Sequence, residues 1–419
     1  MNKNKLYHFS QNLVSLFTVK GLDLALTLGL IPYLILKVGI ANYGTYAFAM
    51  ALMLFFVNVL NYGFDLAVVR ELAKNKDNTA KINQLFNEVF SVKLFLLLLV
   101  YLVLFILVFF VPKFKDGNVL YFSASLLLLG DLFSLRWFFL GLEKMKFITL
   151  ISFFSTIIYV SLVLLLVNEK NDFIWIPFSE AIGLFVISGI AFVWVVKEFK
   201  ITIQLLSIKK ITDYLRLHFN AYVNLLLPST TGVLIVFLVG VFGMPYAVAL
   251  TQVGVKVTSA FATVNTVLTT VFYPMVNREK KNMPPTRYVL LGIGFCLSIL
   301  MYLGSPFLIS NWLHLEQEID VEYTVQIVQI LSPIPFLMGV ISSYGINGLL
   351  VYLKDKLYRR ITVSTTFFIV LSSFFLIPKF PVLGGAITFV IGRALYALLS
   401  FYHFNKIVRL EKQHDGNSK

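Results

Sequence analysis

Long apolar stretches alternate with short basic and polar segments along the whole chain. The run from Leu94 to Val111 is unbroken, and it approaches the roughly 20 residues that cross about 30 Å of hydrocarbon as a helix. Taking the charged segments as boundaries, the pattern predicts about twelve membrane-spanning helices. The expected ranges are 10–36, 42–66, 84–111, 119–140, 148–167, 173–196, 218–241, 247–276, 288–310, 323–350, 361–377 and 383–405.

Composition indicates the same class of protein. Of the 419 residues, 58% are hydrophobic and 13% are charged, against about 45–50% and about 25% in an average soluble domain. A water-soluble fold of this size has a large wet exterior, which this sequence cannot cover with polar side chains. The sequence therefore predicts an all-α integral membrane protein. We expect the first apolar stretch to be a retained helix, because many further spans follow it.

The net charge of +14 comes from basic residues in short loops. No separate domain carries them, so a nucleic-acid partner is not expected. The single cysteine, Cys296, excludes an intrachain disulfide, and the five histidines show no metal-ligand spacing. The sequence also lacks a Walker-type phosphate loop. We therefore expect no metal, no cofactor and no enzymatic activity.

The distribution of lysine and arginine predicts the orientation of the chain. If the N-terminus is cytoplasmic, most of the 35 basic residues fall in inside segments, and the outside segments hold only Lys37, Lys113, Lys115, Lys170 and Lys379. Cytoplasmic loops of membrane proteins carry such an excess of basic residues. Both termini are therefore expected in the cytoplasm, and the outside loops are too short for a catalytic or receptor domain.

The longest inside connection, Lys197 to Leu217, divides the chain into two sets of six helices. We predict an N-terminal six-helix bundle at 1–200, a cytoplasmic linker at 201–217, a C-terminal six-helix bundle at 218–405 and a cytoplasmic tail at 406–419. The end of helix four, from Trp137 to Thr149, resembles the end of helix ten from Asn347 on, although two basic helix ends can look alike without a repeat. Two such bundles in the same orientation would enclose a central cleft.

Charged side chains at membrane depth are costly and usually face a bundle interior or a water-filled cavity. Lys20, Asp23 and Thr27 share one face of the first helix. Two interpretations of this face are open. It is either a self-neutralising pair packed between helices, or the lining of a substrate cavity in which the lysine meets an anionic group.

Helix eight carries the most informative polar stripe. Steps of four, three, four, three and four residues separate Gln252, Lys256, Ser259, Thr263, Thr266 and Thr270. This spacing makes a continuous polar face. Small hydroxyls alone are explained by helix packing, but Gln252 and Lys256 on the same stripe favour a wet lumen. Helix seven has a shorter stripe of Asn220, Asn224 and Thr231.

Three further basic residues fall within spans. Lys93 lies two turns into helix three, where its long side chain is expected to reach the cytoplasmic surface. Arg136 lies near the cytoplasmic end of helix four, where a side chain that reaches the cytoplasmic surface and a local partner in Asp131 are both open. Arg393 is deep in helix twelve, where a lumen position and a buried partner are both open.

The first 150 residues carry a recognisable set of motifs. In order they are Asn12–Phe17, Pro32–Leu34, Tyr43–Gly44, Tyr62–Phe64, Arg70–Ala73, Trp137–Phe139 and Gly141–Lys146. Together they resemble the bacterial O-antigen and polysaccharide flippases of the multidrug, oligosaccharidyl-lipid and polysaccharide exporter superfamily. Leu140 departs from the glutamine that is frequent in that family, and Asn61 and Asp65 stand in reversed order. Residue-level roles for these two motifs therefore do not carry over.

The resemblance implies a flippase in the bacterial inner membrane that moves an undecaprenyl-pyrophosphate-linked oligosaccharide to the periplasmic leaflet. Lys20 and Lys256 are then candidates for binding the pyrophosphate, because helices one and eight face each other in that superfamily. The substrate-binding candidates are Lys20, Asp23, Asn224, Gln252, Lys256, Thr263 and Arg393, with Asn265 as a further contact to sugar hydroxyls. The candidates for ion coupling are Asp23, Asp131 and Glu180. The implied partners are the lipid-linked oligosaccharide, membrane lipids, and the polymerase and chain-length proteins of lipopolysaccharide assembly.

Two other functions are open at this point. A multidrug exporter of the same superfamily would share the fold, but exporters of cationic drugs usually need acidic cavities, and this cleft is expected to be basic. A membrane polysaccharide polymerase or acyltransferase would be expected to show a substantial external loop or a set of acid, base and nucleophile. The sequence has neither.

Overall fold

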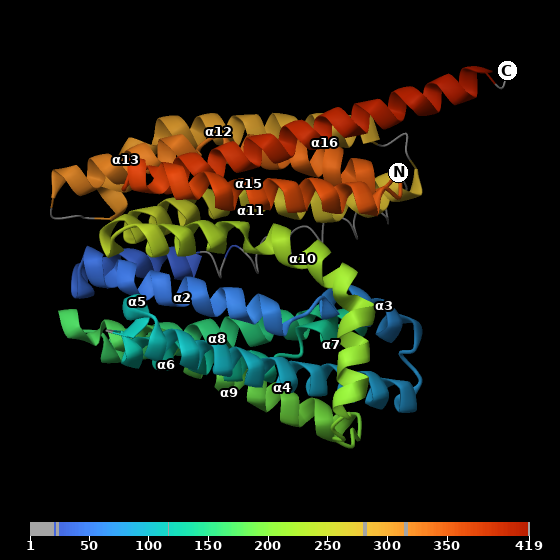
Figure 1. Ribbon diagram of the computed structural model, residues 1–419, viewed down its shortest axis with the longest axis horizontal. Coiled ribbons are helices and arrows are strands. Elements are labelled where there is room, and N and C mark those ends of the chain that lie inside the picture. Colours follow the sequence, from blue (N-terminus) through green and yellow to red (C-terminus); the bar gives the residue numbers. More distant parts are fainter. Residues whose placement is uncertain (1–20, 22–24, 116, 280–282, 314–316, 418–419) are drawn as a thin grey trace. The chain divides into compact units, whose positions relative to one another are not determined.

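The computed structural model describes residues 21, 25–115, 117–279, 283–313 and 317–417 (Figure 1). Every regular element in these ranges is a helix. The first helical stretch is Ala25–Val38. It is followed by α2 (Ile40–Leu60), α3 (Phe64–Lys74), α4 (Thr79–Phe110), α5 (Pro112–Lys115), α6 (Asn118–Leu132), α7 (Arg136–Gly141), α8 (Met145–Leu166), a 3-10 turn (Lys170–Ile174), α9 (Trp175–Glu198), α10 (Ile208–Phe242), α11 (Pro245–Arg278), α12 (Met283–Trp312), α13 (Glu318–Leu331), α14 (Ile334–Val340), a π-helix (Ile341–Leu350), α15 (Asp355–Lys379) and α16 (Gly384–Asn417).

The expected spans coincide with helices. Among the described residues, ten helices are long and apolar enough to cross a membrane. Two shorter apolar stretches, Ala25–Val38 and Thr231–Phe242, lie where the first and seventh spans are expected. The all-α membrane fold predicted from the sequence is therefore confirmed.

Three spans are less regular than the hydrophobic pattern suggests. The predicted helix 42–66 ends at Leu60, and a turn with Tyr62 and Gly63 at positive φ leads into the separate helix α3. The predicted fourth span consists of α6 and α7, and the tenth consists of α13, α14 and the π-helix. Hydrophobicity does not reveal such breaks, because the chain stays largely apolar through them.

By packing, the chain forms two compact units. The N-terminal unit comprises residues 25–237, and the C-terminal unit contains the described residues from Leu238 onwards. The division falls inside α10, whereas the sequence predicts a linker at 201–217. Only 201–207 of that stretch is non-helical. The predicted boundary between two functional bundles stays a prediction.

An aromatic core holds one end of the N-terminal unit together. Phe86 of α4 packs against Trp137 and Phe138 of α7, with ring centroids 6.2 and 6.1 Å apart. Gly141 leaves room for Leu72 of α3, whose Cβ lies 2.9 Å from the position of a Cβ added to the glycine. Atoms of that kind do not approach so closely without a shift, so this crossing of α3 and α7 requires a glycine.

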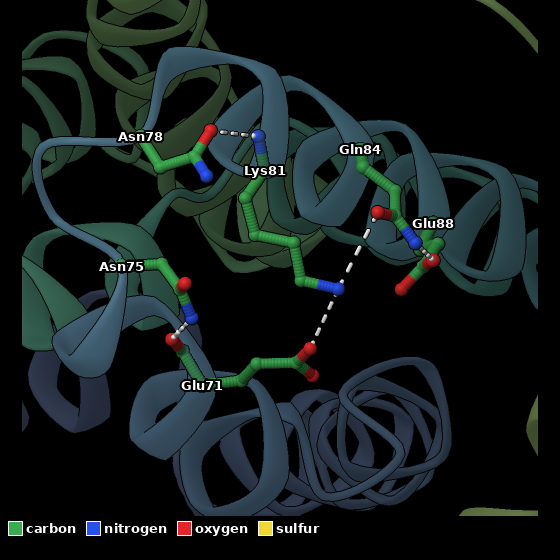
Figure 2. Close-up of polar contacts among 6 residues, drawn as sticks. All are labelled: Glu71, Asn75, Asn78, Lys81, Gln84 and Glu88. Carbon is green, nitrogen blue, oxygen red and sulfur yellow. Dashed lines mark hydrogen bonds and ion pairs between the residues drawn. The ribbon is translucent and has the colours of Figure 1, made fainter.

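Polar contacts fix the turn between α3 and α4 (Figure 2). Glu71 of α3 forms an ion pair with Lys81 of α4, with 2.7 Å between the carboxylate oxygen and Nζ. The side chain of Asn78 caps α4 by accepting a hydrogen bond from the Lys81 backbone N–H. Lys76, in the same turn, pairs with Glu143 after α7 at 2.6 Å. These contacts join two segments that carry the family-like motifs.

One backbone turn recurs in both units. After α7, the N–H of Lys144 donates to the carbonyl five residues earlier at 2.8 Å, and Glu143 has a φ of 58°. After the π-helix, the N–H of Lys354 donates in the same way at 2.9 Å, and Leu353 has a φ of 55°. This bond and the left-handed residue are typical of a helix end. The same turn also follows α9, where the N–H of Ile201 donates to the Val196 carbonyl at 2.9 Å and Lys200 has a φ of 49°. The turn is therefore a general helix end in this chain, and the repeat expected from helices four and ten stays a prediction.

Candidate functional site

The polar stripe of α11 lies outside the packed core of the C-terminal unit. In the stripe, Ser259, Thr266 and Thr270 are exposed, and Gln252, Lys256 and Thr263 are half-buried. The opposite face of α11 is packed, since Thr258, Asn265 and Thr269 are at most 5% exposed. The helix therefore separates a structural face from a polar face that is free to meet a ligand.

The hydroxyl groups of this stripe bond to their own helix. Thr263 donates to the carbonyl of Ser259 at 2.7 Å, and Ser259, Thr266 and Thr270 make the same bond one turn back. Such bonds satisfy a hydroxyl without a neighbouring helix. Within the described part of the chain, neither the Lys256 ammonium nor the Gln252 amide has a hydrogen-bond or ion-pair partner. This pair is a cation and an amide available to an anionic, polar ligand.

Three candidates cannot be placed. Lys20 and Asp23 lie outside the described residues, and so does the side chain of Asn224 in α10. The approach of Lys20 to Lys256 across a cleft therefore stays a prediction.

Arg393 of α16 lies half-buried within the C-terminal unit. Its guanidinium stands over the ring of Phe389, 5.3 Å from the centroid. Its Nε is buried and has no partner among the described residues. One turn along α16, the hydroxyl of Tyr396 is 2.9 Å from that of Thr362. The open donor keeps Arg393 a candidate for binding an anion.

Lys93 does not reach the cytoplasmic surface as the sequence led us to expect. The residue is 1% exposed, and its Nζ donates to Asp131 of α6 at the backbone carbonyl (2.7 Å) and at the carboxylate (3.1 Å). The amide of Asn61 reaches the same carboxylate at 3.4 Å. Because the Asp131 carboxylate compensates the charge of the ammonium, the Lys93 side chain can stay buried instead of extending to the cytoplasmic surface. The sequence did contain a signal for this ion pair, because two neighbouring spans carry opposite charges, Lys93 in one and Asp131 in the next.

Glu180 of α9 lies among tyrosines of the N-terminal unit. Its carboxylate accepts a hydrogen bond from Tyr46 of α2 at 3.2 Å. Tyr43 and Tyr159 are close enough to interact with it electrostatically. Both of these rings are at most 8% exposed. A carboxylate placed among hydroxyls at membrane depth is the kind of group that can exchange a proton.

Asn265 is not a candidate for sugar contacts, contrary to the expectation from the sequence. It is fully buried, and its amide donates to the carbonyl of Pro335 at 2.7 Å. The amide also lies 2.9 Å from the position of a Cβ added to Gly294. Asn265 therefore joins α11 to α12 and α14, because its place off the stripe turns it into the core.

Comparison with known proteins identifies the family. The family described as polysaccharide biosynthesis protein matches residues 9–280, more than half of the chain. The chain belongs to this family. It is 28% identical over 418 residues to a proposed O-antigen transporter of Escherichia coli strain K12, covering 97% of this chain and 100% of the relative. A second proposed O-antigen transporter, from Shigella dysenteriae, is 25% identical, with 93% of this chain and 98% of the relative covered.

Solved structures share the fold of this family member. A lipid II flippase, MurJ, in an inward closed conformation has a TM-score of 0.75 at 15% identity, covering 93% of this chain and 87% of that protein. An inward-facing multidrug resistance transporter of the MATE family has a TM-score of 0.67 at 13% identity, covering 93% and 96%. The family expected from the motifs is therefore confirmed, and the relatives named above are transporters, as expected for a chain that is not an enzyme.

Proposed function

We propose that this family member is a flippase for an undecaprenyl-pyrophosphate-linked oligosaccharide, the repeat unit of O-antigen or a related surface polysaccharide. It would move this unit from the cytoplasmic to the periplasmic leaflet of the bacterial inner membrane by alternating access. The observation that carries the proposal is the polar stripe of α11, whose Lys256 and Gln252 are half-buried at membrane depth and have no hydrogen-bond or ion-pair partner among the described residues. The family and its O-antigen transporter relatives support the same substrate class.

The physical problem of this reaction is the headgroup. A sugar chain with a pyrophosphate is very costly to move through hydrocarbon, because its polar groups lose water without replacement. A polar, cationic path lowers that cost, and the lipid tail can stay in the bilayer. In the proposal, Lys256 and Lys20 bind the pyrophosphate and Arg393 offers a further cationic donor. Gln252, Thr263 and Asn224 bind sugar hydroxyls.

Ion coupling through Asp23, Asp131 or Glu180 is part of the proposal. Among the described residues, Asp131 is neutralised by Lys93, whereas Glu180 is bonded to a neutral hydroxyl. Both carboxyl groups stay candidates for taking up a proton. Translocation in reconstituted vesicles should slow when the ion gradient is collapsed, and an unchanged rate would exclude coupling.

Complementation of a bacterial strain that lacks its flippase tests the proposal. The wild-type gene should restore the surface polysaccharide, and a charge reversal at Lys256 should lower it at least about tenfold, because a charged contact to the substrate turns repulsive. Arg278→Glu, at the exposed end of the same helix, is the matched control and should retain function.

Two outcomes would contradict this assignment. Full function in both Lys20→Glu and Lys256→Glu would show that the anion site lies elsewhere. A gene disruption that leaves the polysaccharide intact but raises drug sensitivity would favour a multidrug exporter, the alternative that the likeness to the MATE fold supports.

A further inference from the structure

Residues 201–207, the non-helical segment after α9, are hydrogen-bonded to α4 of the same unit. The backbone N–H groups of Thr202, Gln204 and Leu206 donate, in that order, to the side chains of Asn83, Asn87 and Ser91, at 2.8 to 3.0 Å. The Asn87 amide also donates to the Thr202 carbonyl at 2.8 Å. Side chains of a helix thus replace the partner strand that an extended backbone would otherwise need.

The spacing of the donors along the segment matches the spacing of the acceptors along α4. The three acceptors on α4 are four residues apart, a rise of about 6 Å per step. The donors are two residues apart in extended chain, a rise of about 6.6 Å per step. The segment therefore runs alongside α4 in the same direction, from its start towards the apolar run that begins at Leu94.

This register sets the level of the segment relative to the membrane. Leu206 is held beside Ser91, three positions before the apolar run. That run of about 27 Å accounts for the hydrocarbon thickness. Leu206 and the residues that follow therefore lie where hydrocarbon gives way to lipid headgroups.

The residues at this level expose apolar side chains beside cations. Ile203, Leu205 and Ile208 are 47%, 62% and 69% exposed. Exposed lysines flank them on both sides, at Lys197, Lys200, Lys209 and Lys210. Apolar side chains with adjacent lysines are typical of segments that lie in the interface of a bilayer with anionic lipids.

The first half of α10 continues along the same level. It runs across the direction of α2, α4 and α6 in the N-terminal unit (Figure 1). Tyr62 fixes it there, since its hydroxyl donates to the Leu215 carbonyl at 2.9 Å and its ring stacks on Tyr222 with centroids 4.3 Å apart. A helix that crosses the spans at their ends lies in the plane of the membrane surface.

We propose that residues 203–210 are a docking surface for anionic phospholipids of the cytoplasmic leaflet. Ile203, Leu205 and Ile208 enter the boundary between headgroups and acyl chains, and the flanking lysines bind lipid phosphates. The hydrogen bonds to α4 hold the segment at the depth where the apolar side chains reach acyl chains and the lysines reach phosphates. The proposal assumes the orientation expected from the loop charges, which places this segment on the cytoplasmic side. It does not depend on the transported cargo, because residues 203–210 and Lys256 belong to different units.

Fluorescence quenching in vesicles tests the proposal on the full chain. Replacing Cys296, the single cysteine, by serine gives a background in which Leu205→Cys carries an environment-sensitive dye. Asp77→Cys, in the exposed turn between α3 and α4, is the matched control. Vesicles of phosphatidylcholine receive either phosphatidylcholine or phosphatidylglycerol brominated near the top of the acyl chain.

We expect brominated lipid to quench the dye at position 205 and not at position 77, with phosphatidylglycerol the stronger quencher. The preference for phosphatidylglycerol should fall about fivefold for each lysine replaced in Lys209→Gln and Lys210→Gln, and it should weaken at high salt. Lys354→Gln and Lys356→Gln, exposed at the start of α15, should leave it unchanged. Quenching at position 205 by aqueous iodide as strong as at position 77, without quenching by lipid, would overturn the proposal and point to a soluble partner or to water.

Discussion

Lys93 and Asp131 place two opposite charges inside the N-terminal unit, where both residues are buried. The ammonium makes two hydrogen bonds to the aspartate residue, one of them to its backbone carbonyl. The amide of Asn61 donates to the other oxygen of the carboxylate. Burying both charges is costly, so the pair is stable only while both members are present. Any role of Asp131 in ion coupling therefore depends on Lys93.

We expect Lys93→Met to destabilise the protein by about 3–5 kcal/mol, because it leaves the Asp131 carboxylate buried without its cation. Adding Asp131→Asn should recover part of the loss. Thermal unfolding of the purified protein in detergent measures both effects. Lys81→Met, which removes the half-buried partner of the exposed Glu71, is the control and should cost about 1 kcal/mol or less. A Lys93→Met protein as stable as the wild type would show that the pair is dispensable.

At the scale of elements, α11 combines two faces with different tasks. Gly254 on the packed side allows Ile327 of α13 to approach, since a Cβ there would overlap the Ile327 side chain. On the same side, Asn265 donates to the carbonyl of Pro335. On the opposite side, the side chains of Gln252 and Lys256 make no hydrogen bond or ion pair with another described residue. Substitutions on the two faces should therefore separate stability from transport.

Asn265→Ala should lower the free energy of unfolding by about 1–3 kcal/mol, because the buried Pro335 carbonyl loses its donor. Gln252→Ala should leave thermal stability close to the wild type and reduce transport, since its amide has no partner within the described structure. Thermal unfolding and a vesicle translocation assay, run on both variants, measure the two effects. Equal stability of the two variants would show that Asn265 is not structural.

At the scale of the whole molecule, the two units share a local structure that few identical residues encode. The turn at Glu143 and the turn at Leu353 have the same backbone conformation, although one residue is acidic and the other apolar. Each turn joins a broken span to a following helix with basic residues near its start. Under the orientation expected from the loop charges, both turns lie in the cytoplasm.

The orientation can be measured directly in the Cys296→Ser background. We expect a membrane-impermeant thiol reagent to label Lys113→Cys in cells whose inner membrane is intact, because this residue lies between spans expected to end outside. Asp77→Cys and Asp355→Cys should be labelled only after the inner membrane is permeabilised. The reverse pattern would contradict the cytoplasmic placement of both termini.

Much of the fold and part of the site follow from the sequence. Among the described residues, ten of the expected spans coincide with helices long enough to cross a membrane and two with shorter apolar helices, because hydrocarbon allows only structures that satisfy every backbone group internally. The stripe on α11 was visible in the spacing of its polar residues and lies outside the packed core. The breaks at Leu60 and within the fourth and tenth spans were not visible, because a helix can stop or widen without losing its apolar character.

What the sequence alone determined about this protein is the all-α membrane fold, the family and the polar face of α11. These depend on local composition and on periodicity, which neighbouring segments do not alter. Only the tertiary structure decided the partners of individual side chains. Lys93 meets Asp131 38 positions away, and Asn265 meets Pro335 70 positions away. Such pairs depend on how helices pack, and a long side chain at membrane depth is equally compatible with water, a ligand or a buried partner until its neighbours are known.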